Sequence, residues 1–297
     1  MKTLLIKQAL ISYTAFHNCD IMLASIGVLL YRNSFFMVKK ILSDKPTQLF
    51  IILSCFFVAN ALIAECIGGK LFSLERVFGI APHPFSLLGE GGLTFTLTAG
   101  VLLWPLEFIM TDIVNEYFGP KAVRRISFIA VGLICYAFVM FYLAIQVPAE
   151  TSFWVGSQKD AGIPDMQAAF TGVFGQGMWI IAGSLMAFLV SQLVDVWIFH
   201  KIKKTTGDKY VWLRATGSTV VSQLVDSFIV LFIAFKIGKG WSYQRVIAIG
   251  LVNYSYKFTM ALILTPVIYA IEKGINNYLG KETTLAMKNA AMGKENE

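Results

Sequence analysis

The stretch "ATGSTVVSQLVDSFIVLFIAF", residues 215–235, decides the fold, because it has the length and apolar character of a helix that crosses a bilayer. A membrane span needs about 20 mostly apolar residues in a row. This one nevertheless carries Asp226 near its centre, where a charge is costly and usually functional. The pentapeptide that ends at Asp226, Ser-Gln-Leu-Val-Asp, also ends at Asp195 inside the preceding apolar run. Two neighbouring spans therefore carry the same three polar side chains, and the presence of these side chains inside apolar segments needs an explanation.

Composition indicates that the bilayer surrounds most of the chain. Of the 297 residues, 56% are hydrophobic and only 14% are charged, whereas soluble domains carry about 25% charged residues. The net charge of +7 is typical of a membrane protein whose cytoplasmic loops are rich in lysine and arginine. No basic patch with interleaved aromatics lies outside the apolar runs, so nucleic acid is not an expected partner.

Six apolar stretches are long enough to span the membrane. They are Leu49–Gly69, Gly92–Thr111, Ile126–Val147, Gln176–Phe199, Ala215–Phe235 and Val246–Ile271. Lysine and arginine are concentrated in the loops that lie inside the cell if both termini are cytoplasmic. The sequence therefore predicts an all-α integral membrane protein, a six-transmembrane-helix bundle with both termini cytoplasmic.

The chain divides into three parts. Residues 1–36 are interpreted as an N-terminal extension of uncertain role, because polar residues interrupt their apolar run and Met37 opens a more typical start. Residues 37–280 form the predicted six-helix membrane domain. The polar segment 281–297 is predicted to be a flexible cytoplasmic tail.

Neither metal binding nor enzymatic catalysis is indicated. The four cysteines, Cys19, Cys55, Cys66 and Cys135, lack metal-ligand spacing, and the three histidines are scattered. The sequence contains no Gly-x-Ser-x-Gly elbow and no His-Glu-x-x-His motif. We therefore expect no cofactor, no metal and no enzyme activity.

The fifth and sixth spans carry opposite charges at similar depth. Asp226 lies at the centre of the fifth span and Lys257 at the centre of the sixth. Opposite charges on consecutive helices favour an ion pair, which lowers the cost of burying both. One interpretation is that the pair takes part in substrate or proton movement, and the alternative is that it only holds two helices together.

Polar residues also recur at helical spacing, and every fourth residue lies on the same face of a helix. On the fifth span this stripe consists of Arg214, Ser218, Ser222 and Asp226, flanked by Thr219 and Gln223. On the fourth span it consists of Ser184, Ser191, Gln192 and Asp195, and on the sixth Asn253 and Tyr256 accompany Lys257. Such stripes are predicted to face a water-accessible cavity or the interior of the bundle.

The second span ends in "LLWPLEFIMTDIVNEYFG", residues 102–119. Pro105 is expected to loosen the helix just before Glu107, and interrupted helices often frame transporter binding sites. Asp112, Asn115 and Glu116 cluster at the predicted cytoplasmic end. The alternative for Asp112 and Glu116 is a solvated helix end. Polar groups that converge from several spans favour a carrier of a small polar solute over a channel.

Four motifs carry a resemblance to a known family. They are "DIVNEYFG" at 112–119, "GSLMAFLVSQLVDVWIFHKIK" at 183–203, "WLRATGSTVVSQLVDSFIVLFIAF" at 212–235 and "KFTMALILTPVIYAI" at 257–271. In this order they resemble the vitamin uptake transporter family, over about residues 37–278. The resemblance implies a bacterial inner-membrane importer of queuosine precursors, 7-deazaguanines such as preQ0 or preQ1, for salvage into modified tRNA. The family's polar motif positions match Asp112, Glu116, Asp195, Arg214, Ser218, Asp226 and Lys257.

The residues are compatible with such a substrate. A 7-deazaguanine presents a pair of N–H donors that a carboxylate accepts in bidentate fashion, and an aromatic side chain can stack on its ring. We expect the polar edge of the base to contact Glu107, Asp226, Gln192 and Gln223. The ring of the base is expected to stack on Trp104, Tyr256 or Phe228. Lys257 is expected to hold Asp226 or to contact O6 of the base. The full predicted substrate-binding set is Trp104, Glu107, Gln192, Asp195, Arg214, Ser218, Gln223, Asp226, Asn253, Tyr256 and Lys257, with Asp112, Asn115 and Glu116 as a cytoplasmic motif.

Several alternatives stay open at this level. The chain could instead be the substrate-binding subunit of an ATPase-driven vitamin-type transporter, or carry another small polar heterocycle. An energising ATPase module and a homo-oligomer are the corresponding candidate partners. The sequence does not distinguish among preQ0, preQ1 and queuine, and it does not identify the energy source.

Overall fold

A computed structural model describes residues 43–175, 177–206 and 210–292. The contacts divide the chain into two units, 1–51 and 52–297. Of the first unit only the beginning of helix α2 (Lys45–Ile67) is described, so the predicted extension at 1–36 lies outside the described residues. The second unit holds every element discussed below.

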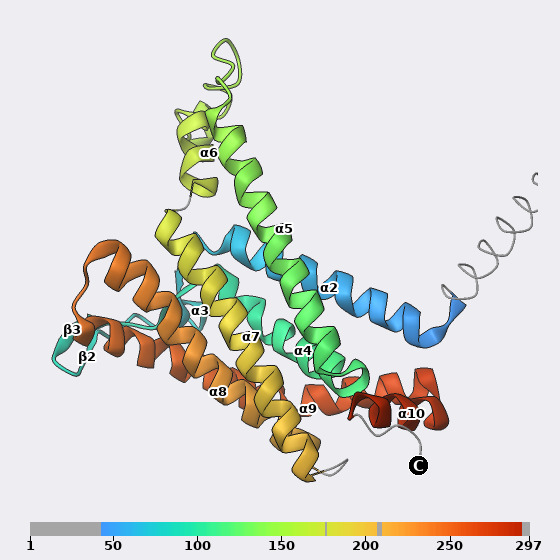
Figure 1. The fold of residues 1–297 in the computed structure, drawn as a ribbon. Coiled ribbons are helices and arrows are strands. Elements are labelled where there is room, and N and C mark those ends of the chain that lie inside the picture. The colour runs from blue at the N-terminus through green and yellow to red at the C-terminus, as the bar shows by residue number, and fades with distance from the viewer. Residues whose placement is uncertain (1–42, 176, 207–209, 293–297) are drawn as a thin grey trace, which may run out of the picture. The chain divides into compact units, whose positions relative to one another are not determined.

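The second unit is mainly helical (Figure 1). Its long helices are the rest of α2, α4 (Trp104–Phe118), α5 (Pro120–Gln146), α7 (Met178–Thr206), α8 (Val211–Leu231) and α9 (Tyr243–Leu279). Shorter helices are α3 (Leu74–Val77), α6 (Met166–Phe174), α10 (Lys281–Ala291), the 3₁₀ turns η1 (Ala99–Leu102) and η2 (Lys159–Ala161), and the π-helical turn η3 (Phe232–Ile237) that continues α8. Two antiparallel ribbons pair β1 (Leu71–Ser73) with β4 (Thr96–Thr98) and β2 (Phe85–Leu87) with β3 (Glu90–Leu93).

Five segments of the described residues are long and apolar enough to cross a membrane. They are Lys45–Ile67, Pro120–Gln146, Met166–Thr206, Leu213–Ile237 and Tyr243–Leu279. Much of their apolar surface is exposed, as on α5 at Phe128, Leu133 and Tyr136, which suits a lipid environment. These segments overlap five of the six predicted spans, to within two residues at their ends, and confirm the prediction of an all-α membrane protein.

The predicted helix Gly92–Thr111 is wrong in its first half. Over this stretch the structure has the end of β3, then β4 and η1, and a helix begins only at Trp104. Threonine and apolar residues alternate from Thr94 to Thr98, which is the period of a strand rather than of a helix. Pro105 stands in the first turn of α4, where its missing N–H costs no hydrogen bond. The proline therefore starts this helix instead of loosening it.

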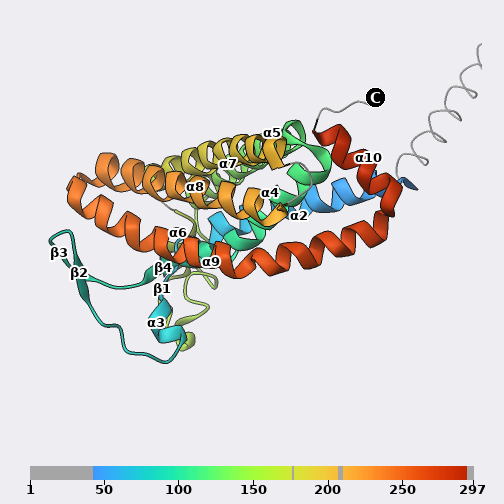
Figure 2. The same ribbon diagram turned by 90° about the horizontal axis from the view of Figure 1, so that it is seen from below.

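The predicted flexible tail at 281–297 is also wrong over most of its length. Residues 281–291 form helix α10, which packs against α4 and α9, as both views of the ribbon show (Figures 1 and 2). Gly280 makes the sharp turn from α9 with a φ of +86°, a conformation that favours glycine. Lys288 on α10 reaches the side chains of Glu116 and Glu272. Buried ion pairs therefore hold the segment that composition alone marks as a solvated tail.

Helix α8 lies between α7 and α9 and packs against both (Figure 2). Its polar stripe is buried as predicted, since Arg214, Ser218, Ser222 and Asp226 expose at most 3% of their surface. On α7, Gly183 allows a close approach, because a Cβ there would lie 3.1 Å from the carbonyl oxygen of Val230. The arrangement places polar side chains of three helices in one interior.

The loop between α5 and α6 has its own local order. The Glu150 carboxylate accepts hydrogen bonds from the Ser152 hydroxyl and from the backbone amides of Ser152, Phe153 and Trp154. These bonds, the Ser152 hydroxyl first, lower the pKa of Glu150 to about 2. Helix α6 follows, capped by Asp165, which accepts from the backbone N–H of Ala168 at 3.0 Å.

The close packing of η1 against α2 leads to a first prediction. A Cβ on Gly100 would lie 2.6 Å from the carbonyl oxygen of Ala64, so Gly100→Ala should push η1 away and destabilise the protein by about 1–3 kcal/mol. The control is Gly132→Ala on α5, where a Cβ meets nothing within 4 Å and alanine favours the helix by up to about 1 kcal/mol. Thermal unfolding in detergent measures both, and equal melting temperatures for the two variants would contradict the prediction.

Candidate functional site

A cavity lies among α2, α4, α5, α7 and α8, and we call it the α2 cavity. The space among its lining atoms is about 420 Å³, with the solvent at its opening included. Its polar lining combines carboxylates, amides and a hydroxyl, and its apolar lining includes three aromatic rings. The lining residues are Asn60, Ala61, Ala64, Glu65, Trp104, Glu107, Phe108, Ile134, Phe188, Ser191, Gln192 and Asp226.

Glu107 is the most distinctive group of the α2 cavity. Its side chain is buried, and Asn60 Nδ2 donates to its Oε2 at 3.1 Å and to the carbonyl oxygen of Leu103 at 2.9 Å. The other carboxylate oxygen, Oε1, is buried and has no hydrogen-bond partner within the part of the chain that the structure describes. Because an unsatisfied buried acceptor is costly, this oxygen is available to a ligand that brings its own N–H donor.

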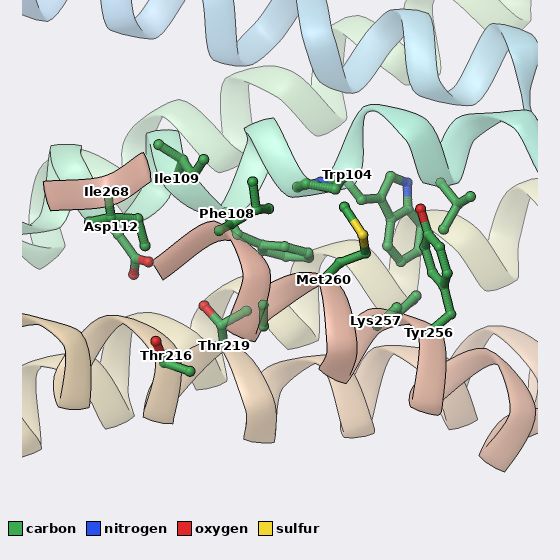
Figure 3. Close-up of a pocket in the computed structure, with 14 residues that line it drawn as sticks. Trp104, Phe108, Ile109, Asp112, Thr216, Thr219, Tyr256, Lys257, Met260 and Ile268 are labelled. Atoms are coloured by element: carbon green, nitrogen blue, oxygen red, sulfur yellow. The ribbon is translucent and has the colours of Figure 1, made fainter. Parts of the chain in front are cut away.

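A second cavity lies among η1, α4, α8 and α9, and we call it the α9 cavity. Its enclosed space is also about 420 Å³, including its opening. Figure 3 shows Trp104 and Tyr256 together at one end and Asp112 at the other, with Phe108 and Met260 between them. Trp104 and Phe108 also line the α2 cavity, so these two rings form a wall between the two spaces.

The predicted ion pair between Asp226 and Lys257 is present and buried. Asp226 lines the α2 cavity and Lys257 lines the α9 cavity, so the pair bridges the wall between them. The Lys257 ammonium also lies 3.5 Å from the centre of the Trp104 ring, a favourable cation–π distance. Ion pair and ring together fix the position of the aromatic wall.

Glu116 is the centre of a separate ion cluster where α4, α7, α8 and α10 meet. Arg214 Nε and Nη2 donate to its two carboxylate oxygens at 3.0 and 2.7 Å. The ammonium groups of Lys203 and Lys288 approach the same carboxylate at 3.0 and 3.3 Å. Arg214 and Glu116 are both buried, so this carboxylate joins four helices inside the protein.

A further group of buried polar side chains is only partly satisfied. Ser222 donates to Asp195 Oδ1 at 3.1 Å, while Asp195 Oδ2 has no partner. The side-chain N and O atoms of Asp112, Asn115 and Gln223 have no hydrogen-bond partner in residues 43–175, 177–206 and 210–292. Because Asp112 and Glu116 are both buried, the alternative that they form a solvated helix end is wrong.

The structure brings together part of the predicted site. The α2 cavity contains Trp104, Glu107, Gln192 and Asp226, and the α9 cavity contains Trp104, Asp112, Tyr256 and Lys257. The remaining predicted residues line neither cavity: Asn115, Glu116, Asp195, Arg214, Ser218, Gln223 and Asn253. Phe228, a stacking candidate, instead packs against Gly250, where a Cβ would lie 2.7 Å from its ring.

Two cavity residues are absent from the predicted site: Asn60, which no pattern in the sequence singled out, and Glu65, which its place near the end of the first span marked as interfacial. Both belong to α2, and Glu65 accepts a hydrogen bond from Ser184 on α7. The available signal lies in "CFFVANALIAECI", residues 55–67. An alanine stands four residues after Asn60 and another stands four residues before Glu65, so each polar residue shares a helix face with a small one. Among the described residues no group of three His, Cys, Asp or Glu side chains could hold a metal ion.

Together, the apolar helices and the two cavities, whose mainly apolar linings carry several buried polar side chains, define a multi-pass membrane protein with polar groups in its interior. The family model described as "Putative vitamin uptake transporter" matches residues 98–271. The chain belongs to this family of vitamin uptake transporters.

Curated relatives agree with this assignment. The chain is 33% identical over 191 residues to the "Probable queuosine precursor transporter" of Bacillus subtilis (strain 168), covering 63% of this chain and 75% of the relative. It is 26% identical over 189 residues to the "Queuosine precursor transporter" of Escherichia coli (strain K12), covering 63% and 76%. No solved structure matches the chain. With these bacterial relatives and its apolar helices, the chain is a multi-pass protein of the bacterial inner membrane.

The bridging ion pair leads to a second prediction. Asp226→Asn leaves the Lys257 ammonium buried without its counter-ion, so we expect a loss of about 3–5 kcal/mol in unfolding free energy. The double variant Asp226→Asn/Lys257→Met removes both charges and should recover part of that loss. Thermal unfolding in detergent of both single variants and the double variant measures the coupling. Additive effects of the two substitutions would show that the pair does not interact.

The ion cluster leads to a third prediction. Glu116→Gln removes the carboxylate shared by Lys203, Arg214 and Lys288, so it should cost about 3–5 kcal/mol. Glu272→Gln is the matched control, because Glu272 pairs with Lys288 alone at a half-buried position. We expect a clearly smaller drop in melting temperature for that control. An equal drop for both would mean that Glu116 is not the centre of the cluster.

Proposed function

We propose that this protein imports queuosine precursors, 7-deazaguanines such as preQ0 and preQ1, across the inner membrane for salvage into modified tRNA. The proposal is supported by the family and by relatives that are named as queuosine precursor transporters. It is also supported by an enclosed cavity whose carboxylates, amides and aromatic rings match the edges and faces of such a base.

The observation that carries the proposal is the unpartnered Oε1 atom of Glu107. A 7-deazaguanine has adjacent donors on N1 and on its exocyclic amine, and a carboxylate is the complementary acceptor. Asn60 holds the Glu107 carboxylate from one side, which orients it before the substrate arrives. Gln192, fixed by the Thr111 hydroxyl at 3.1 Å, is placed to contact a second polar position of the base.

The aromatic rings of the α2 cavity supply the other half of the recognition. Trp104, Phe108 and Phe188 line the same space as Glu107, and a flat heterocycle gains stacking energy against such rings. Lys257 holds Asp226 and touches the face of Trp104. In this arrangement the lysine positions the wall instead of contacting O6, and Tyr256 belongs to the neighbouring α9 cavity.

We further infer six membrane passes with both termini cytoplasmic. Helix α4 has 15 residues, about 22 Å at the usual helical rise, which is too short to cross alone. With the preceding turn η1 of 4 residues, the segment reaches about 30 Å, the thickness of the hydrocarbon core. The unit of η1 and α4 is then the second pass, interrupted beside the cavities as in many transporters.

A fourth prediction tests the role of Glu107 in binding. Glu107→Gln replaces one acceptor oxygen by an N–H₂ group that opposes the donor edge of the base, so affinity for preQ1 should fall at least about tenfold, or 1.4 kcal/mol. The matched control is Glu282→Gln on the exposed surface of α10, which should bind as wild type. Calorimetry or a radioligand assay on the purified protein in detergent measures both, with guanine as the competing base. Equal affinities for the two variants would exclude Glu107 as the donor-edge acceptor.

Uptake assays distinguish this function from the ATPase-driven alternative. A purified chain that accumulates labelled preQ1 in liposomes without ATP needs no ATPase module. Binding without uptake would instead identify the chain as a substrate-binding subunit, if co-expression with an ATPase module restores the uptake.

Cells that depend on salvage should lose uptake with Asp226→Asn if the ion pair supports transport. Intact uptake with lowered thermal stability would show that the pair is structural only.

A further inference from the structure

Asp112 on α4 is a carboxylate that finds no hydrogen-bond partner among the described residues. Only 3% of its surface is exposed, and both of its oxygens lack a donor. It lines the α9 cavity, and its carboxylate points from α4 toward Thr216 and Thr219 of α8 (Figure 3). An ionised carboxylate in such surroundings is costly unless a ligand compensates its charge.

The charged groups around Asp112 do not neutralise it directly. Asp195 of α7, Glu116 of α4 and Arg214 of α8 are close enough to act on it electrostatically. Arg214 donates twice to Glu116, and Lys203 and Lys288 pair with the same carboxylate. On α9, Lys257 also lines the α9 cavity, but it pairs with Asp226 and lies at the opposite end from Asp112 (Figure 3). Among the described residues, neither Asp112 nor Asp195 is paired with a cation, and Asp112 lacks a hydrogen-bond partner as well.

Asp195 is the second acid of the site. It is 2% exposed, and its Oδ2 atom is unpartnered while Oδ1 accepts from Ser222. Two neighbouring carboxylates in a dry interior repel each other when both are ionised, and a shared proton removes that repulsion. A metal ion would need a larger set of ligands, and the described residues contain no group of three such side chains. The chemistry of the pair therefore favours a proton over a metal cation.

We propose that Asp112, with Asp195 beside it, binds the proton whose movement drives substrate uptake. This inference rests on the proposed transport function and adds its energy source. Asp112 takes the proton from water on the outer side and releases it to the cytoplasm, without any covalent change in the substrate. When the proton is bound, the repulsion between Asp112 and Asp195 is removed, and α4 and α7 approach each other. When the proton is released, the two carboxylates repel each other and the helices move apart.

The site is connected to the α2 cavity through the same two helices. On α4, Asp112 stands one turn after Phe108, and on α7, Asp195 stands one turn after Gln192. The hydrogen bond from Thr111 to Gln192 joins these helices between the proton site and the α2 cavity. A change in the distance between α4 and α7 therefore alters the space in which Glu107 and Gln192 meet the base.

The test is uptake by the full-length purified chain in liposomes, with labelled preQ1 and the membrane potential clamped at zero. An inward proton gradient of about one pH unit should accumulate substrate about tenfold if one proton moves with each molecule. Asp112→Asn should abolish this accumulation while it retains binding and one-for-one exchange of labelled for unlabelled preQ1. Asp112→Glu should restore the accumulation, and Asp160→Asn, an exposed carboxylate in the loop before α6, should behave as wild type. Asp195→Asn serves as a second variant if Asp112→Asn does not fold, and should shift the pH dependence of uptake.

Several results would overturn the inference. Accumulation driven by a sodium gradient at equal pH, or indifferent to both gradients, excludes the proton as the driving ion. Unchanged proton-driven accumulation in Asp112→Asn excludes this carboxylate as its binding site. If the wild-type chain binds and exchanges preQ1 but never accumulates it against a gradient, the proposed function stands and the coupling fails. If it binds no 7-deazaguanine at all, the proposed function fails and this inference fails with it.

Discussion

A carboxylate enclosed among membrane helices needs a cation, a proton or a ligand, because the surroundings offer little water to stabilise its charge. This constraint organises the interior of the protein. Glu116 is compensated by an arginine and two lysines, and Asp226 by Lys257. Within the described residues, Glu107 accepts from an amide on one oxygen and from no group on the other, and Asp112 has no hydrogen-bond partner. The degree of compensation thus separates carboxylates that hold helices together from those that are available to a substrate or a proton.

Helix α4 carries carboxylates of both kinds. Within 15 residues it carries Glu107 in the α2 cavity, Asp112 in the α9 cavity and Glu116 in the ion cluster. Its aromatic side chains Trp104 and Phe108 form the wall between the two cavities. Because one helix presents all of these groups, a displacement of α4 as a body would move them together. This coupling is what a carrier needs in order to link substrate binding to an energy source.

The sequence analysis succeeded where a single helix supplied the signal. The spacing of Arg214, Ser218, Ser222 and Asp226 was sufficient to predict a buried polar stripe, since every fourth residue shares a face. The pairing of Asp226 with Lys257 followed from charge and depth. It failed where the decisive partners lie on distant helices. Asn60 stands 47 residues before Glu107, and α10 is fixed by ion pairs to α4 and α9, which its polar composition could not reveal.

The sequence by itself determined that the chain is embedded in a bilayer. It also determined the positions of most helices along the chain and the charged residues that cannot face lipid. It could do so because hydropathy and helical period are local properties. Only the tertiary structure decided how those charges are compensated. Whether a buried carboxylate is paired depends on which side chains of other helices come within hydrogen-bond distance of it. The packing of the helices against one another decides which side chains do. The two copies of Ser-Gln-Leu-Val-Asp show the difference. Asp226 has a lysine, whereas Asp195 has a serine on one oxygen and none of the described donors on the other.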